Sequence, residues 1–202
     1  MPSGSTGARP SRVRTLLVMG VTAVVILAVS YLANRPAAGG GGFTSVVLSG
    51  RSSGPAPEVG KAAPDFTATT IEGSEVTLSK LRGRPLWLTF GASWCQPCRA
   101  ENPDIQAAYE KYRAQGLRVL SIFIQDDSSD IVDYAKRAGL TYPKVDDSDS
   151  RIASGYRIVG IPSHFFVDGS GTLRAIRISS LDPSTIDENL AEIGVDLDRP
   201  TN

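Results

Sequence analysis

The sequence ASWCQPCR (residues 92–99) comes directly after the apolar run PLWLTFG (residues 85–91). A short continuous apolar run of this kind favours a buried central strand. The periodic apolar positions that follow predict a helix from about Cys95 to Arg113. The only two cysteines of the chain, Cys95 and Cys98, are therefore expected where a buried strand meets the start of a helix.

The spacing of the two cysteines predicts thiol chemistry. Residues i and i+3 lie on one face of a helix, so the two sulfurs can reach each other. Unpaired N–H groups and the positive end of the helix dipole lie beside Cys95, which favours its thiolate, the attacking species. Cys98 lies one turn deeper and should be better shielded. We expect Cys95 to attack a partner disulfide and Cys98 to resolve the mixed disulfide.

Length, composition and charge limit the function further. The 202 residues carry no formal net charge, but five basic residues precede Glu58, the first acidic residue. The remainder has 16 basic and 21 acidic side chains and gives no reason to expect nucleic-acid binding. One cysteine pair does not staple a fold, and a domain of roughly 140 residues buries an adequate core without one. The expected partners are proteins or small thiols.

The N-terminal part of the chain predicts a membrane anchor. Residues 15–33 contain no charged side chain, and 19 helical residues extend roughly 28 Å, close to the hydrocarbon thickness of a bilayer. Arg9, Arg12 and Arg14 precede this run, so residues 1–14 should stay cytoplasmic and the rest should cross. The alternative is a cleaved signal peptide and a secreted protein. Either way the domain is expected outside the cytoplasm.

Residues 34–57 are predicted to be a flexible linker, because they are rich in glycine, serine and proline. The short run Phe43–Leu48 is an exception within this linker, and either makes a local contact or has no role. The catalytic domain is expected over residues 58–197, followed by a tail at residues 198–202.

Beyond the cysteines, the pattern predicts an α/β domain with a mixed sheet covered by helices. The expected strands and helices are a hairpin at 65–70 and 76–78, a buried strand at 117–124, a helix at 128–137, a short strand at 141–145, a hairpin at 163–168 and 172–179, and a final helix at 183–193.

Three motifs together resemble the thioredoxin superfamily, and more narrowly its membrane-anchored TlpA/ResA/DsbE branch. They are WCQPCRxExP from Trp94, the lead-in Gly60–Phe66, and Gly160-Ile161-Pro162. The resemblance covers roughly residues 58–195. It implies a thioredoxin-like mixed sheet flanked by helices, with an N-terminal β-hairpin and a central αβ insertion between Gln125 and Gly160. It also implies that the redox-active disulfide Cys95–Cys98 works without a cofactor or metal.

The resemblance also implies roles for single residues. Cys95 is the nucleophile and Cys98 the resolving thiol. Pro162 is the cis-proline that packs against the cysteine pair and presents the backbone of Ile161 to a bound client chain. Glu101 matches an acidic residue that exchanges protons near the thiols, with a solvated helix position as the alternative.

Other positions near the motif carry weaker expectations. Trp94 is expected as a platform beside the nucleophile, with simple packing as the alternative, and Pro97 is placed with it on the client-binding surface. Ser163 and His164 stand where the family usually has two threonines. His164 either lies near the sulfurs, where a charged imidazole would favour a thiolate, or is a strand residue with a satisfied ring nitrogen.

Four other kinds of site fit less well. Structural zinc needs four ligands, and two cysteines with His164 do not supply them. Haem attachment needs a histidine where Arg99 stands. A peroxiredoxin shares the lead-in but has proline and threonine where this chain has Leu88 and Ala92. A copper chaperone of the Sco type generally has three residues between its cysteines, and this chain has two.

The sequence therefore predicts an extracytoplasmic thiol–disulfide oxidoreductase that reduces or exchanges disulfides in client proteins. By resemblance, the clients are CxxCH motifs of apocytochrome c or a partner in cytochrome assembly. Electrons would come from a membrane thiol carrier of the CcdA/DsbD kind. A disulfide oxidase or isomerase is the alternative with the same chemistry, because the direction depends on the reduction potential.

Overall fold

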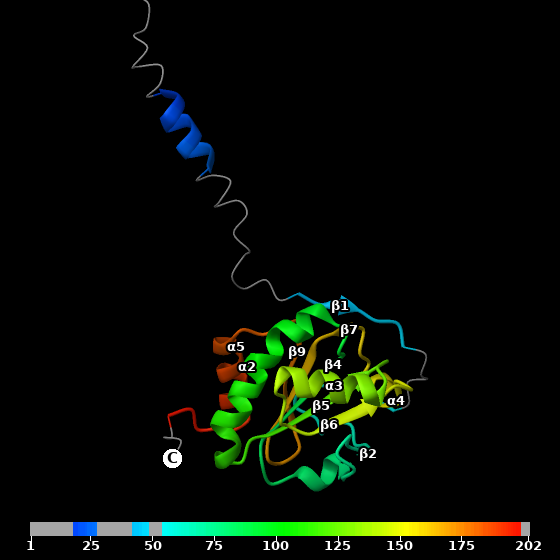
Figure 1. The fold of residues 1–202 in the computed structure, drawn as a ribbon. Helices are drawn as coiled ribbons and strands as arrows, with labels where there is room; N and C mark the ends of the chain where they lie inside the picture. Colours follow the sequence, from blue (N-terminus) through cyan, green and yellow to red (C-terminus); the bar gives the residue numbers. More distant parts are fainter. Residues whose placement is uncertain (1–17, 28–41, 49–53, 199–202) are drawn as a thin grey trace, which may run out of the picture. The chain divides into compact units, whose positions relative to one another are not determined.

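The computed structural model describes residues 18–27, 42–48 and 54–198. The chain divides into two units, Met1–Gly40 and Gly41–Asn202. In the first unit, residues 18–27 form an exposed helix (Figure 1). Among the described residues, no helix has both the length and the apolarity needed to span a bilayer. The predicted anchor at residues 15–33 extends beyond the described residues at both ends, and the predicted N-terminal segment at residues 1–14 lies outside them.

The second unit is built on a five-stranded mixed sheet, as the sequence predicts. Its strand order is β6-β5-β4-β8-β9 (Figure 1). Strands β4, β5 and β6 are parallel to one another, whereas β8 is antiparallel to both β4 and β9. The bounds are β4 Leu86–Gly91, β5 Arg118–Ile124, β6 Lys144–Asp147, β8 Ser163–Val167 and β9 Leu173–Ile178.

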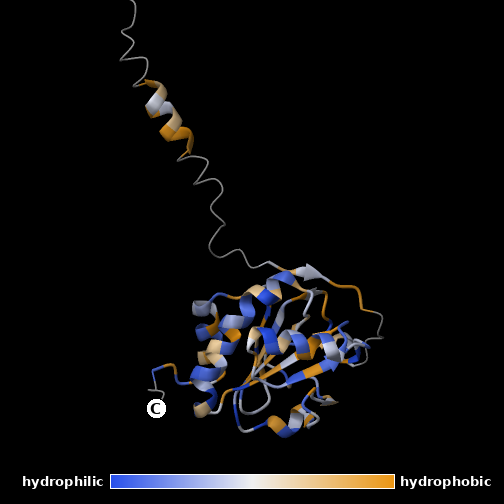
Figure 2. Cartoon of the chain, viewed as in Figure 1, coloured by the Kyte–Doolittle hydropathy of each residue, from blue (hydrophilic) through white to orange (hydrophobic). Residues whose placement is uncertain are grey.

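Alternation along the central strands divides the core between the two faces of the sheet. Trp87, Val119 and Phe123 pack with three helices, α2 (Gln96–Tyr112), α3 (Ser128–Ala138) and α5 (Pro183–Glu192). The even-numbered positions of β4 and β5 point to the opposite face. Figure 2 shows hydrophobic residues along the strands and hydrophilic residues on the outer sides of the helices.

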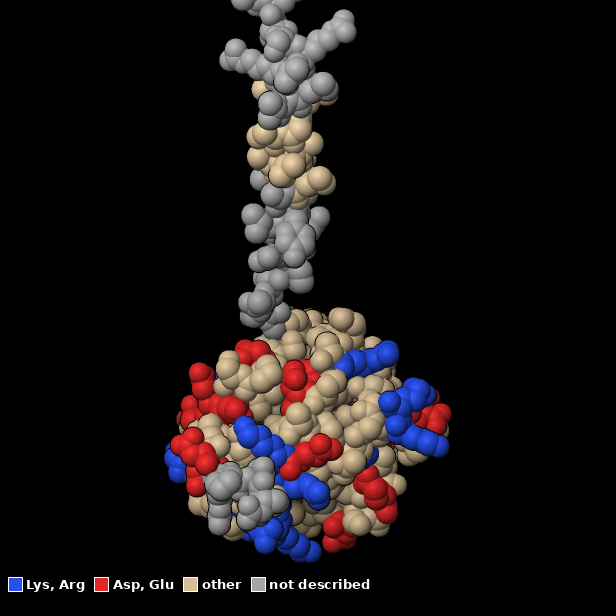
Figure 3. Space-filling model, turned by 60° about the vertical axis from the view of Figure 1, so that its left-hand side comes forward, with Lys and Arg blue, Asp and Glu red and all other residues tan. Residues whose placement is uncertain are grey.

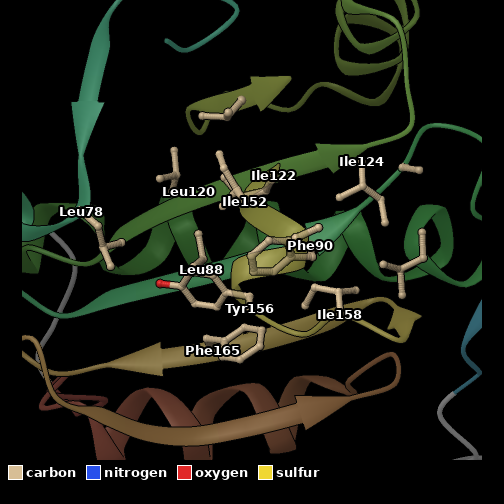
Figure 4. Packing of buried hydrophobic residues seen from close by; sticks show 14 of the residues in the cluster. Leu78, Leu88, Phe90, Leu120, Ile122, Ile124, Ile152, Tyr156, Ile158 and Phe165 are labelled. Atoms are coloured by element: carbon tan, nitrogen blue, oxygen red, sulfur yellow. The ribbon is translucent and has the colours of Figure 1, made fainter. Parts of the chain in front are cut away.

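The opposite face is covered by α4 (Arg151–Gly155), the 3₁₀ helix η1 (Leu78–Leu81) and the hairpin of β2 (Thr67–Thr69) and β3 (Glu75–Thr77). An aromatic cluster lies at its centre, where Phe90 packs against Tyr156 and Phe165 (Figure 4). The three ring pairs have centroids 4.9 to 5.5 Å apart, within the range of favourable aromatic contacts.

The N-terminal hairpin and the αβ insertion are both present, the latter as α3 and β6. Pairing in β6 begins at Lys144, later than the predicted start at Thr141, because Pro143 has no N–H to donate to a ladder. Helix α2 ends at Tyr112, one residue earlier than predicted, and is followed by a 3₁₀ turn, η2 (Arg113–Gln115). Gly116 then takes a φ of 103°, a conformation that glycine adopts readily.

One pairing has no counterpart in the sequence-based prediction. The two-residue strand β1 (Thr44–Ser45) pairs with β7 (Gly160–Ile161), which directly precedes Pro162. β1 belongs to the short run Phe43–Leu48 within the predicted linker, of which the structure describes residues 42–48 and 54–57. This run therefore makes a local contact with the domain.

Candidate active site

The two cysteines lie at the carboxyl end of the central strand β4. Cys95 and Cys98 form a disulfide, with their Cα atoms 5.3 Å apart. Gly91 ends β4, and a short turn leads to the start of α2 at Gln96. The carboxyl edge of parallel strands is a common place for functional sites, because loops and helix N-termini meet there. The structure therefore shows the oxidised form of this site.

Cys95 is the N-cap residue of α2, and its sulfur accepts a hydrogen bond from the backbone N–H of Cys98 at 3.2 Å. This N–H is one of the helix-terminal donors that have no partner within the helix. When the disulfide is reduced, the same donor and the helix dipole favour a thiolate on Cys95. The two cysteines are thus inequivalent, because the sulfur of Cys95 lies outside the first turn.

The segment before Pro162 lies against the sulfur of Cys95. The Ile161–Pro162 peptide bond is cis, the isomer that the resemblance implies. The carbonyl oxygen of Ile161 lies 3.9 Å from the Cys95 sulfur. The structure thus brings together Cys95, Cys98, Ile161 and Pro162, although more than 60 residues separate the two pairs in the sequence.

The predicted difference in shielding between Cys95 and Cys98 does not appear in the structure, because both cysteines are buried. The exposed fraction is 1% for Cys95 and 3% for Cys98. The run at residues 42–48 crosses the site and contributes to the burial of Cys95. The hydroxyl oxygen of Thr44 lies 4.0 Å from the Cys95 sulfur.

Trp94 is 46% exposed beside Cys95, and its indole N–H donates to the carbonyl oxygen of Gln125 at 3.1 Å. Its ring therefore offers an apolar surface next to the disulfide, as a platform residue would. Pro97 is half-buried and borders Gly42, where an added Cβ would lie 3.5 Å from the proline ring.

Asp126 supports the turn that carries the cysteines. Its carboxylate accepts hydrogen bonds from both the backbone N–H and the hydroxyl of Ser93. The residue is only 5% exposed, and burial raises the pKa of its carboxyl group above the usual value. Sequence reasoning missed this contact. Its place in the sequence could have predicted the contact. Asp126 follows β5, which is parallel to β4, so it lies at the same edge of the sheet as the cysteines.

Glu101 lies in a buried polar cluster and not in solvent, so the alternative of a solvated helix position is wrong. It is 4% exposed, and its Oε2 accepts the backbone N–H of Leu181 at 3.0 Å. Its Oε1 lies 3.4 Å from Nε2 of His164, a contact without good hydrogen-bond geometry. On the helix Glu101 follows Cys98 by three residues, which places both on the same face.

His164 is fully buried on β8, opposite Thr89 of β4. The indole N–H of Trp87 donates to its Nδ1 at 3.3 Å. Nδ1 is therefore the acceptor of this hydrogen bond, and Nε2 faces Glu101. The prediction that His164 is a strand residue with one satisfied ring nitrogen is therefore confirmed. The carboxylate of Glu101 is an additional neighbour of the ring.

Within the described part of the chain, no group of three or more histidine, cysteine, aspartate or glutamate side chains is arranged to hold a metal ion. The site consists of the two sulfurs of Cys95 and Cys98, the N-terminus of α2 and the buried carboxylate of Glu101.

Comparison with known proteins places this geometry in a family context. The model of the AhpC/TSA family matches residues 59–176. The chain is 32% identical over 135 residues to the thiol-disulfide oxidoreductase ResA of Geobacillus kaustophilus, covering 67% of this chain and 78% of that protein.

Two crystal structures are also similar. One is a Chlorobium tepidum protein assigned as the thiol:disulfide interchange protein DsbE, with a TM-score of 0.63 and 25% identity, covering 69% of this chain and 100% of that one. The other is StoA of Bacillus subtilis, with a TM-score of 0.56 and 26% identity, covering 64% of this chain and 98% of that one.

Proposed function

This chain belongs to the AhpC/TSA family and is a thiol–disulfide oxidoreductase of the ResA and DsbE type, and we propose that it reduces disulfides of extracytoplasmic client proteins. The observation that carries the proposal is the Cys95–Cys98 disulfide at the N-terminus of α2, with the backbone of Ile161 beside it. A dithiol at a helix N-terminus supplies a stabilised thiolate, and a neighbouring backbone edge gives an extended client a place to bind.

The exchange proceeds in two steps. In the reduced enzyme, the Cys95 thiolate attacks one sulfur of the client disulfide, forming a mixed disulfide and releasing the other client sulfur as a thiolate. Cys98 then loses its proton and attacks the Cys95 sulfur. The mixed disulfide breaks, the second client sulfur leaves as a thiolate, and the Cys95–Cys98 disulfide forms. Two electrons pass to the client, and its thiolates take up protons from water.

Glu101 is proposed to receive the proton of Cys98 in the second step. It is buried on the same face of α2 as Cys98, its Oε2 accepts the backbone N–H of Leu181, and its Oε1 lies 3.4 Å from Nε2 of His164.

The catalytic cycle needs a source of electrons. We place a membrane thiol carrier of the CcdA/DsbD kind in this role, and oxidised CxxCH motifs of apocytochrome c among the clients. On the face shown in Figure 3, positive and negative side chains are interspersed. A surface of mixed sign supports protein clients over nucleic acid, which would favour a continuous positive field.

The proposed location is the outer side of the cell membrane, through a single N-terminal span. Residues 15–33 carry no charge and follow three arginines, and residues 18–27 are helical. Alkaline phosphatase fused after Asn202 tests the location, because this reporter folds only where its disulfides form. We expect an active fusion; an inactive fusion at equal expression would place the domain in the cytoplasm.

The copper-chaperone alternative receives no support from the arrangement of His164. Its Nδ1 already accepts the N–H of Trp87, and its Nε2 faces Glu101. A disulfide oxidase or isomerase keeps the same residues and differs only in reduction potential.

The proposed activity is tested with a synthetic peptide that carries one intramolecular CxxCH disulfide. The full chain, with dithiothreitol as electron source, should speed reduction of this peptide over dithiothreitol alone. Cys95→Ser should abolish the acceleration. Equal acceleration by the wild type and Cys95→Ser would contradict the proposal.

A further inference from the structure

Residues 42–48, which we call the strap, cross the active site as an extended segment. Thr44 and Ser45 pair antiparallel with Ile161 and Gly160, and the backbone N–H of Val46 donates to Val159 at 3.1 Å. The strap thus satisfies the backbone edge directly before Pro162. An extended client that adds a strand to this edge needs the same hydrogen-bonding groups.

Both ends of the strap are held to the domain by hydrogen bonds. At one end, the backbone N–H of Ser180 donates to the carbonyl oxygen of Gly42 at 3.1 Å. At the other, the side-chain amide of Gln125 donates to Val47 at 2.8 Å. Gln125 is also the residue that accepts the indole N–H of Trp94, so the strap is tied to the platform beside Cys95.

The side chains of the strap fit the domain. An added Cβ at Gly160 would lie only 2.8 Å from the ring of Phe43, so the absence of a side chain at this position gives the ring its space. Val46 and Leu48 pack against the hydrophobic cluster that contains both cysteines. Val47, between them, is 89% exposed, as alternation along an extended segment requires.

Thr44 occupies the approach to the nucleophile. Its hydroxyl oxygen lies 4.0 Å from the sulfur of Cys95, which is 1% exposed. In either direction of exchange, a sulfur of the partner must come within bonding distance of this atom, about 2 Å. The side chain of Thr44 therefore stands next to the position that a partner's cysteine takes in the mixed disulfide.

We infer that the strap is an intramolecular occupant of the client-binding edge, and that protein partners react with Cys95 only after the strap has left β7. This inference rests on the proposed function, because it takes β7 as the edge to which an extended client adds a strand. The strap should slow reaction with a protein more than reaction with a small thiol, because a protein needs the backbone edge of β7 as well as access to the sulfur. A partner displaces it by offering the same backbone pairing together with a sulfur in place of the Thr44 hydroxyl.

The position of the strap is tested by cross-linking in the full chain. In a Cys98→Ser background, Thr44→Cys should form a disulfide with Cys95 on exposure to oxidised glutathione, detected as a linked pair of tryptic peptides by mass spectrometry. The matched control is Val47→Cys in the same background, because that side chain points to solvent. No cross-link with Thr44→Cys, or equal cross-linking with both, would overturn the inference.

The effect of the strap on client access is tested by substitutions that release it. Val46→Pro removes the donor to Val159, and Val47→Pro is its control, because alternate N–H groups of a paired strand face away from the partner. Loss of the hydrogen bond from Val46 to Val159 should raise the rate at which Val46→Pro reacts with the CxxCH peptide roughly threefold to tenfold. Phe43→Ala, which keeps every backbone donor, should act in the same direction.

The small reductant separates this inference from the proposed function. Reduction of the Cys95–Cys98 disulfide by dithiothreitol should differ much less among these variants than reaction with the peptide. The inference that the strap slows reaction with a protein partner would be overturned by equal rates with the peptide for wild type, Val46→Pro, Phe43→Ala and Val47→Pro. If no variant reacts with the peptide while dithiothreitol still reduces the disulfide, the proposed function fails, and the cross-link alone decides where the strap lies.

Discussion

The carboxylate of Glu101 lies 3.4 Å from the imidazole of His164, and both side chains are almost completely buried, at 3% and 0% exposure. Trp87 holds the far side of the ring through its indole N–H. A carboxylate in this position is shielded from water but lies one helical turn from Cys98. Its charge is therefore expected to influence the thiols.

Glu101→Gln should shift the pH dependence of thiol reactivity. A nearby negative charge disfavours a thiolate, so the neutral amide should move the alkylation profile of the reduced cysteines to lower pH. The measurement is the alkylation rate of the reduced protein against pH. Glu110→Gln is the matched control, because Glu110 is exposed on the same helix. An unchanged profile for Glu101→Gln would remove Glu101 from the proton-handling role.

His164→Leu should destabilise the domain. The substitution leaves the buried indole N–H of Trp87 without its acceptor, which costs about 1–3 kcal/mol. Urea unfolding followed by tryptophan fluorescence measures the change in free energy. A variant as stable as the wild type would show that the Trp87–His164 contact contributes nothing to folding.

The local parts of the fold could be predicted from the sequence. The strand β4 and the helix α2 follow from an apolar run and from periodic apolar positions, and the predicted helix bounds differ from α2 by one residue at each end. These signals act over a few residues, so they can be read without the tertiary structure.

The contacts made across the site could not be predicted in the same way. The pairing of Thr44 with Ile161 joins residues more than 100 positions apart, in strands of two residues that carry no alternation pattern. Thr44 contributes to the burial of Cys95 through that pairing, so helix position alone does not predict how far the two cysteines are shielded. The hydrogen bond that His164 accepts likewise depends on Trp87, a neighbour that only the sheet register supplies.

Asp147 should make the stability of the domain depend on pH. Burial raises the pKa of its carboxyl group from 3.8 to about 6 in the folded state, despite hydrogen bonds from the backbone of Ile152 and Ala153. Between these values the unfolded chain loses the proton that the folded chain retains. The contribution of Asp147 to the free energy of unfolding therefore falls as the pH rises from about 4 to about 6, and is constant above that.

Asp147→Asn removes this titration. The difference in free energy of unfolding between wild type and variant, measured by urea titration at several pH values, should decrease from pH 4 to pH 6. A difference that is constant over this window would show that Asp147 has the same pKa in the folded and unfolded states.

Cys98→Ser should accumulate mixed disulfides with clients in cells, because the variant can attack but cannot resolve the intermediate. Cys95→Ser should accumulate none, since its remaining thiol is not the N-cap residue of α2. Non-reducing gels of membrane extracts give the measurement. Equal trapping by the two variants would reverse or abolish the assigned division of roles.

The reduction potential of the Cys95–Cys98 pair tests the central claim most directly. The full chain is equilibrated in dithiothreitol or glutathione buffers of known potential, and the fraction of disulfide is determined by thiol alkylation. A reductase of client disulfides should have a potential near or below about −200 mV. A potential near or above about −150 mV would identify an oxidase and contradict the account.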